Sequence, residues 1–356
     1  MKILIQQVVI PDYRLGFFSA LRQELVDCEV SVLAGEEDFT ITPRSSNEAW
    51  DLYEKITNHY FFKRKLLWQC ILLRAVRSDL VILNSNTRIL SNWAILVLRK
   101  LFFKKTYLWG HVSGKNTRFN SLRDLFIRLS DGFIAYTESQ KASLLSKNLV
   151  KRVVSANNAC LSVGECDFIE KPSYELNAIV YVGRLIKSKK VELLIRAFAQ
   201  SVKKGTLPSD ATLVIVGEGA EREALERTVE KEAIKNVFFK GHVIDSAELK
   251  DIYSTAFASI SPGYVGLSAT QSFSFGVPMC VSKDEFHSPE IEACIEPFNT
   301  KFFHTDDIDS LSEALEHLYK ERDFYHSKRA EICQWTQNNY SFESMAKSFK
   351  ELLFNL

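Results

Sequence analysis

Two basic side chains, Arg184 and Lys189, follow an apolar run at residues 178–182, in a segment that reads GRLIKSKK over residues 183–190. The apolar run predicts a buried strand, and a helix is expected over residues 190–204, ending near Gly205. Ligands of open parallel α/β sheets bind beyond the carboxyl ends of the strands. A guanidinium and an ammonium there suit a diphosphate, because they stabilise the charge that grows on a leaving phosphate oxygen. The alternative is an ordinary solvated basic loop.

Two further Gly-containing segments follow predicted strands. Residues 216–220 read VGEGA between a predicted strand at 212–216 and a helix at 219–233. The third glycine of a dinucleotide fingerprint is missing, so this segment favours a tight turn over a phosphate cradle. Residues 261–278 read SPGYVGLSATQSFSFGVP, a Gly-rich loop followed by a helix that begins near Leu267. Backbone amides of a loop at the start of a helix suit an anion.

In order and spacing, these three segments resemble the C-terminal domain of the retaining glycosyltransferases of family 4, which have the GT-B fold. The shared pattern is GRL, then Lys after three residues, an Ala-Phe pair in the next helix, a Val-Gly-x-Gly turn and a strand ending in glycine, here FKGHV at 239–243. The resemblance implies that Arg184 and Lys189 hold the donor diphosphate. It also implies that the donor lies against Gly183, Val243, Gly263, Tyr264, Val265, Gly266, Leu267, Ser268 and Gln271.

The chain departs from the family pattern at three positions. Lys190 stands where the family often has glycine, and the two family glutamates, eight positions apart, fall on Gly263 and Gln271. In the family the first glutamate contacts the transferred sugar and the second contacts the ribose. Gln271 can still form hydrogen bonds to a ribose, but Gly263 offers only backbone. The resemblance therefore implies altered recognition of the donor sugar, or loss of activity.

The N-terminal half resembles the family less specifically. Predicted strands at 2–9, 30–33, 80–83, 106–109 and 132–136 alternate with helices or long loops, as in a parallel sheet. The resemblance places His111 against the donor sugar and Gly16 in a loop near the diphosphate. Residues 11–14 are expected to meet the acceptor, and Thr137 and Glu138 are weaker candidates for the same region. A lone histidine is otherwise more often structural.

The length of 356 residues predicts two domains. We expect an acceptor-binding Rossmann-like domain at 1–168, a donor-binding Rossmann-like domain at 169–334 and a C-terminal helix at 335–356 that packs back on the first domain. The polar stretch at 166–177 is the predicted linker. The fold class is therefore α/β, with two doubly wound parallel sheets facing a cleft as in GT-B.

Basic residues predominate before residue 165 and acidic residues after it, so the charge of the first half suits an anionic partner. Residues 60–77 and 93–105 mix Phe, Trp and Leu with Lys and Arg, as interfacial helices do, although core-packing helices with solvated charges are the alternative. No recognisable nucleic-acid reader motif accompanies them, so nucleic acid is not expected as the partner. The seven cysteines and the absence of a signal-like or spanning segment favour a cytoplasmic protein, which could be peripheral on the membrane.

The resemblance implies a hexosyltransferase that moves a sugar from a nucleoside diphosphate to a glycan, which could be lipid-linked. Retention of the anomeric configuration and a role in cell-surface polysaccharide synthesis, such as lipopolysaccharide or capsule, are expected. No cofactor or metal is expected, because Arg184 and Lys189 can act on the diphosphate in place of a divalent ion and no Asp-x-Asp motif follows a strand. The alternatives are a noncatalytic GT-B scaffold or glycan-binding subunit and a sugar-nucleotide epimerase.

Overall fold

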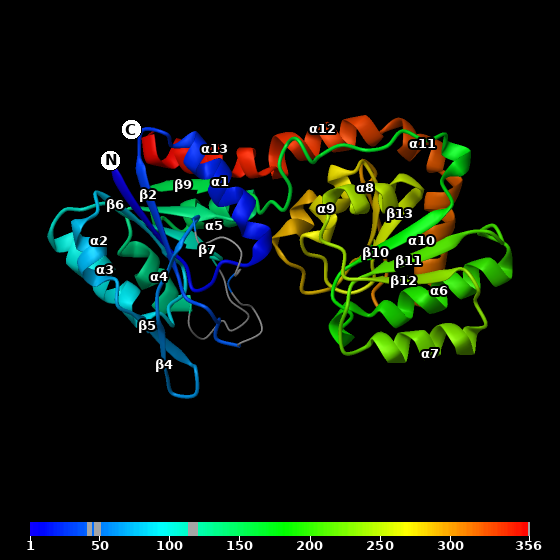
Figure 1. The fold of residues 1–356 in the computed structure, drawn as a ribbon, viewed down its shortest axis with the longest axis horizontal. Helices are drawn as coiled ribbons and strands as arrows, with labels where there is room; N and C mark the ends of the chain where they lie inside the picture. The colour runs from blue at the N-terminus through cyan, green and yellow to red at the C-terminus, as the bar shows by residue number, and fades with distance from the viewer. Residues whose placement is uncertain (41–44, 46–50, 113–119, 355–356) are drawn as a thin grey trace. The chain divides into compact units, whose positions relative to one another are not determined.

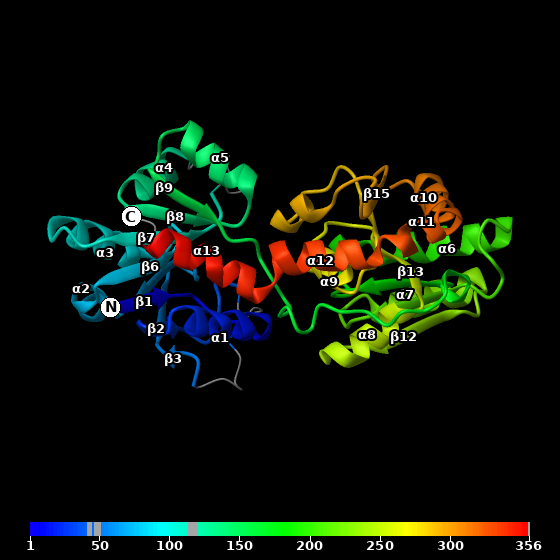
Figure 2. The same ribbon diagram turned by 90° about the horizontal axis from the view of Figure 1, so that it is seen from above.

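The computed structural model describes residues 1–40, 45, 51–112 and 120–354 (Figures 1 and 2). The chain forms two compact units. Unit 1 comprises Met1–Cys160 together with Phe342–Leu356, and unit 2 comprises Leu161–Ser341. Each unit is built on its own parallel sheet, so the doubly wound α/β class expected from the sequence is confirmed.

Unit 1 contains a seven-stranded sheet in the order β3-β2-β1-β6-β7-β8-β9, with every neighbouring pair parallel. The central strands are apolar runs because both faces of the sheet are covered. Ile3 and Ile5 pack into one core cluster and Leu4 into the other, as the period of two in a strand requires. The strands are β1 (Lys2–Gln6), β2 (Glu29–Ala34), β3 (Glu54–Lys55), β6 (Leu80–Asn84), β7 (Thr106–Gly110), β8 (Gly132–Ala135) and β9 (Arg152–Ser155).

Two layers of helices cover this sheet. Figures 1 and 2 show α1 and α13 side by side, although the two helices lie at opposite ends of the chain. Phe349 of α13 contacts the rings of Phe17 in α1 and Trp109 in β7, with centroids 5.0 Å apart in each pair. The C-terminal helix is therefore part of the unit 1 core. The helices of unit 1 are α1 (Leu15–Glu24), α2 (Leu72–Arg77), α3 (Leu90–Leu101), α4 (Asn120–Arg128), α5 (Glu138–Ser146) and α13 (Phe342–Phe354).

The segment 60–77 corrects the expectation of an interfacial helix. Most of it belongs to an antiparallel hairpin of β4 (Asn58–Phe61) and β5 (Leu66–Gln69), and only its end forms the short α2. Burial alternates along β4, so the apolar and aromatic residues have the period of a strand and not of a helix. Phe62, Lys63 and Arg64 form the tip with φ of 50°, 54° and 60°.

The second basic segment, 93–105, contains α3 as expected, but one of its cations is not exposed. The Arg99 side chain is fully buried and donates to the carbonyl oxygens of Ala75, Ser78, Asp79 and Lys105. Desolvation lowers the pKa of Arg99 to about 10. Arg99 therefore joins neighbouring loops of unit 1 and is not available to a membrane surface.

Unit 2 contains a six-stranded parallel sheet in the order β12-β11-β10-β13-β14-β15. The chain runs outward from β10 to β12 and then returns to the other side of β10 at β13. The strand order thus reverses between β10 and β13, the kind of point at which ligands bind in open α/β sheets. The strands are β10 (Ala178–Val182), β11 (Thr212–Val216), β12 (Val237–Gly241), β13 (Ala256–Ser261), β14 (Met279–Ser282) and β15 (Thr300–Phe303).

The helices of unit 2 lie on both faces of its sheet. Figure 1 shows α6 and α7 along one face and α8 and α9 toward the other. The amphipathic helix α10 packs on α6. The helices are α6 (Val191–Lys204), α7 (Arg222–Glu232), α8 (Ser246–Ser254), α9 (Ser268–Ser274), α10 (Ile308–Lys320), α11 (Arg322–Ser327) and α12 (Arg329–Tyr340).

Candidate functional site in unit 2

The loops that follow β10 and β13 meet at the reversal of strand order. The first loop enters a 3₁₀ turn at Lys187–Lys189, and the second contains Gly263 and Tyr264. A Cβ atom on Gly263 would lie 2.3 Å from the carbonyl oxygen of Ser188 and 3.0 Å from the Cα of Lys189. Only glycine therefore lets the two loops approach this closely.

This approach brings together Arg184, Lys189 and Tyr264, three residues that the sequence assigned to the donor site. Lys189 Nζ donates to the backbone oxygen of Tyr264 at 2.8 Å and lies 3.5 Å from the centre of the Tyr264 ring. Arg184 Nη2 lies 3.3 Å from the Tyr264 hydroxyl, to which it donates. The two cations thus lie at one strand end and share one aromatic neighbour, although they are separated by four intervening residues.

Lys189 lies in a partly desolvated place beside another cation. Desolvation and the nearby positive charge of Arg184 lower the pKa of Lys189 to about 8, against a smaller opposing effect of Glu290. Two positive charges held close together in a partly desolvated place are unfavourable without an anion. The arrangement is therefore suited to binding a negatively charged group, and a diphosphate carries enough charge for both.

Lys190 has a structural role that explains why this position favours glycine in the family it resembles. Its backbone lies in the left-handed region, with φ of 52° and ψ of 36°, immediately before α6. Its ammonium forms ion pairs with Glu285 at 2.5 Å and with Asp306 at 2.6 Å. These contacts fix the turn that carries Lys189.

The Gly217-x-Gly219 turn packs against the loop that follows β10. A Cβ on Gly217 would lie 1.9 Å from the oxygen of Gly183, and one on Gly219 would lie 2.2 Å from the oxygen of Leu185. Leu185 N donates to Glu218 O at 2.9 Å. This geometry agrees with the tight turn favoured from the sequence, and Gly183 is held between this turn and the ring of Tyr181.

The structure adds His287, which no sequence motif indicated. It lies in the loop after β14, and its Nδ1 accepts a hydrogen bond from Val265 N at 3.0 Å. The proton of the neutral ring is therefore on Nε2, a buried atom with no hydrogen-bond partner of normal geometry among the described residues. Desolvation lowers the pKa of His287, which keeps the ring neutral.

The remaining predicted donor-site residues lie on two neighbouring segments. Val265 is buried, whereas Gly266, Leu267 and Ser268 are partly exposed along the loop and the first turn of α9. Gln271 follows on α9 with a partly exposed side chain, and Val243 lies in the loop after β12. The strand order places that loop two strands away from β10, so Val243 borders the same end of the sheet.

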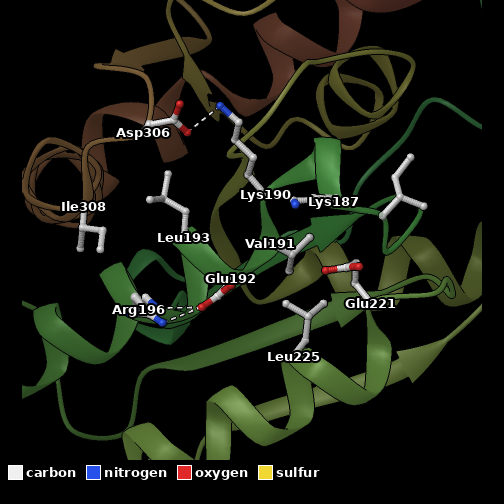
Figure 3. Close-up of a pocket in the computed structure, with 11 residues that line it drawn as sticks. Lys187, Lys190, Val191, Glu192, Leu193, Arg196, Glu221, Leu225, Asp306 and Ile308 are labelled. Atoms are coloured by element: carbon white, nitrogen blue, oxygen red, sulfur yellow. Dashed lines mark hydrogen bonds and ion pairs between the residues drawn. The ribbon is translucent and has the colours of Figure 1, made fainter.

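A cavity of about 450 Å³ opens beside Lys190, on the face of unit 2 that carries α6 and α7 (Figure 3). Figure 3 shows Lys190 paired with Asp306 at one side and Arg196 paired with Glu192 at the other. Leu193, Leu225 and Ile308 supply apolar walls. Arg184, Lys189 and Tyr264 do not line this cavity, and two of its cations, Lys190 and Arg196, are already paired with carboxylates, so we place the anion site at the strand end and not here.

The predicted site residues of unit 1 lie on loops and helices next to the sheet of that unit. His111 follows β7, with its ring centroid 4.8 Å from that of Tyr136. Gly16 lies in the first turn of α1, where a Cβ would be 2.1 Å from the ring of Phe342, so close packing on α13 explains the glycine. Thr137 caps α5 by accepting from Gln140 N at 3.1 Å, and Glu138 pairs with Lys141.

Within the part of the chain that the structure describes, no three His, Cys, Asp or Glu side chains gather as a metal site. All seven cysteines are free thiols. Among the same residues, no helix has both the length and the apolar character needed to cross a membrane.

Comparison with known proteins relates this geometry to a family. A family model described as "Glycosyl transferases group 1" matches residues 167–334, which is nearly all of unit 2. Among curated protein sequences, no match was found.

Solved structures extend the similarity to the whole chain. The structure of HepE from Anabaena in complex with UDP has a TM-score of 0.74 at 13% identity, with 100% of both chains covered. Sucrose-phosphate synthase from Thermosynechococcus elongatus has a TM-score of 0.68 at 18% identity and covers 100% of this chain and 98% of its own. The lipopolysaccharide outer core galactosyltransferase WaaB has a TM-score of 0.65 at 16% identity, with 100% and 99% covered. The chain thus has the GT-B fold of these glycosyltransferases, and its residues 167–334 match the glycosyl transferases of group 1.

Proposed function

We propose that this protein is a hexosyltransferase that transfers a sugar from a nucleoside diphosphate to a glycan acceptor, in the manner of family 4 and with retention of the anomeric configuration. The observation that carries the proposal is the cluster of Arg184, Lys189 and Tyr264 at the reversal of strand order, inside the segment that matches the group 1 family. HepE has been solved with UDP and with UDP-glucose, which makes uridine nucleotides the first donors to test.

In the proposed reaction, the bond between the anomeric carbon and the diphosphate oxygen breaks while a bond to an acceptor hydroxyl oxygen forms. The leaving diphosphate gains negative charge, and Arg184 and Lys189 stabilise it. The acceptor proton leaves with the diphosphate. Gly263 offers no side chain to the sugar, so stabilisation of the leaving group is the main contribution of this loop, and no metal ion is required.

The setting proposed for the reaction is the cytoplasmic face of a membrane, where surface polysaccharides such as lipopolysaccharide or capsule begin on lipid-linked acceptors. The similarity to WaaB, a lipopolysaccharide outer core galactosyltransferase, supports this class of acceptor. Exposed apolar side chains of unit 1 lie next to basic residues, as in proteins that bind an anionic lipid surface. Phe62 is 75% exposed between Phe61 and Lys63, and Phe103 is 97% exposed before Lys104.

A screen of nucleoside diphosphates and nucleotide sugars by thermal shift and donor hydrolysis tests the proposal. We expect one nucleotide sugar to stabilise the protein and to be hydrolysed slowly, with the rate unchanged by a chelator. Arg184→Ala should abolish both effects. Arg227→Ala is the matched control, because Arg227 is an exposed arginine on α7 whose ion pair with Glu223 is 3.9 Å long.

Three outcomes would contradict the proposal in different ways. No response to any nucleotide would favour the noncatalytic scaffold. Conversion of the donor sugar to its epimer without an acceptor would favour an epimerase. A nucleotide response that survives Arg184→Ala would show that the nucleotide does not bind at the cluster of Arg184, Lys189 and Tyr264.

A further inference from the structure

Unit 1 contains a buried arginine that no carboxylate neutralises. Arg14 ends the 3₁₀ turn Asp12–Arg14 that precedes α1, and it is only 9% exposed. Its guanidinium lies among the rings of Tyr13, Trp109 and Tyr136, at 5.6, 4.8 and 5.4 Å from their centroids. Buried charges in proteins are usually paired, yet no ion pair joins Arg14 to a carboxylate within the described chain.

The hydrogen bonding of Arg14 is also incomplete. Nη2 donates to the hydroxyl of Tyr136 at 3.0 Å, but Nη1 is buried and has no partner of normal hydrogen-bond geometry among the described residues. Burial acts to lower the pKa of Arg14, while Tyr136 and Tyr13 raise it above its usual value, so the side chain stays charged. A buried N–H donor on a permanent charge is costly unless it binds an acceptor. The absence of a hydrogen-bond acceptor for Nη1 among the described residues indicates that a ligand supplies one.

A second arginine on another element shows the same feature. Arg123 lies on α4, and its Nη1 is likewise buried without a partner in the described part of the chain. Desolvation lowers the pKa of Arg123, with Asp124 on its own helix as the opposing charge. His111 is near both arginines: after desolvation, the charges of Arg14 and Arg123 are the causes that lower its pKa. His111 and Arg14 both lie against the ring of Tyr136, whose centroid is 4.8 Å from that of the His111 ring and 5.4 Å from the guanidinium carbon of Arg14. Arg123 is the second positive charge that acts on His111.

We propose that Arg14, Arg123 and His111 form a subsite for an oxyanion, a phosphate or carboxylate group carried by the acceptor glycan. A guanidinium binds such groups with two parallel N–H donors, and the unpartnered Nη1 atoms supply donors from two sides. The aromatic rings around Arg14 hold its plane in place and exclude water, so little side-chain freedom is lost on binding. The neutral ring of His111 adds one donor.

This inference rests on the proposed function, in which the diphosphate of the donor is held by Arg184 and Lys189 of unit 2. The oxyanion of unit 1 then belongs to the other substrate. The acceptor is accordingly an acidic one, either phosphorylated, as a lipid-linked glycan is, or a glycan that ends in a uronic acid. A neutral oligosaccharide lacks the group that Arg14 requires.

Calorimetric titration of the full chain tests the subsite directly. The titrations use the Arg184→Ala background, so that the anion site of unit 2 is weakened and the result does not depend on the donor proposal. Inorganic phosphate, glucose 1-phosphate and glucuronate are the probes, and glucose is the neutral control. We expect phosphate or glucuronate to bind and glucose not to bind, and the stronger of the two anions identifies the acceptor group.

Substitutions then locate the binding. Arg14→Gln and Arg123→Gln should each weaken anion binding roughly tenfold or more, because each removes a charge-assisted pair. Arg128→Gln is the matched control on α4, where the Arg128 side chain is exposed, and it should change nothing. Arg14→Lys keeps the positive charge but loses the parallel N–H donors of the guanidinium, so this variant should bind the anion less tightly than wild type.

Absence of anion binding to a folded chain, or equal binding in Arg123→Gln and Arg128→Gln, overturns the inference. If Arg14→Gln fails to fold, the anion affinities of Arg123→Gln and Arg14→Lys still test the subsite. Anion binding that depends on Arg14 but no nucleotide binding to wild type would leave the subsite standing and defeat the donor proposal instead.

Discussion

Lys189 shows how one side chain connects the geometry of the site to a measurable pH dependence. Its pKa of about 8 means that the ammonium is mostly charged at pH 7 and mostly neutral at pH 9. A diphosphate favours the charged form, so binding should weaken as the pH rises through 8. We expect the affinity for the nucleoside diphosphate that the protein binds to fall about tenfold between pH 7 and pH 9, as measured by calorimetry.

The control for this prediction is Lys189→Arg, which keeps a positive charge across the whole range. Its affinity should be flat between pH 7 and pH 9, because a guanidinium does not titrate there. A wild-type profile as flat as that of the variant would show that Lys189 does not contact the diphosphate.

At this scale the sequence predicted part of the site. Arg184 and Lys189 could be found because they follow an apolar run in the chain, and the position after a strand is informative by itself. Residues 11–14 were expected to meet the acceptor, but the burial of Arg14 depends on Trp109 and Tyr136, which are distant in sequence. His287 and Arg123 belong to no motif, and only the packing of the loops shows that their nitrogen atoms lack partners.

At the scale of elements, the contact between the loop after β13 and the 3₁₀ turn Lys187–Lys189 determines where the cations lie. Gly263→Glu would restore the residue that the family resemblance expects at this position. Its Cβ would lie 2.3 Å from the backbone oxygen of Ser188, so one of the two backbones must move. We expect the variant to lose about 1–3 kcal/mol of unfolding free energy by denaturant titration. Nucleotide affinity should fall at least tenfold by calorimetry, because Lys189 and Tyr264 are displaced.

Gly164→Glu is the matched control for that experiment, since nothing lies within 4 Å of a Cβ built on Gly164 in the same unit. It should leave both stability and affinity near wild type. Higher nucleotide affinity or faster transfer in Gly263→Glu would mean that the loop accepts a carboxylate and that the glycine is not needed for the approach.

Elements with strong local signals could be predicted, and elements defined by their neighbours could not. The strands β1, β6, β7, β10 and β11 are apolar runs of the kind that a parallel sheet buries on both faces. The short β3 and β9 have no such run, and they are strands because a neighbouring strand pairs with them. The hairpin of β4 and β5 was mistaken for a helix because mixed aromatic and basic residues suit either an exposed helix or an exposed hairpin.

At the scale of the whole molecule, length predicted two domains, and the alternation of strands and helices predicted the α/β class. Each unit has its own core. The chain enters unit 1 twice, because α13 completes the cluster around Phe17, Trp109 and Phe349. No local pattern marks that return, since a C-terminal amphipathic helix can pack on any apolar face. The excess of basic residues in the first half of the chain is likewise visible only over the whole sequence, and it favours binding of unit 1 to an anionic surface.

If unit 1 binds an anionic membrane, the exposed pair Phe102 and Phe103 next to Lys104 should contribute directly. The two rings are 62% and 97% exposed, and burying them in the interfacial region should strengthen binding about tenfold or more. We expect wild type to sediment with vesicles that contain an anionic lipid, less so at high salt, and not with neutral vesicles. Replacing both phenylalanines by serine should reduce the bound fraction sharply.

Val26→Ser is the control, because Val26 is 77% exposed in the same unit but stands beside Asp27 and lacks basic neighbours. Equal sedimentation of both variants would show that the two phenylalanines do not insert into the lipid. The protein would then meet its acceptor away from the lipid surface.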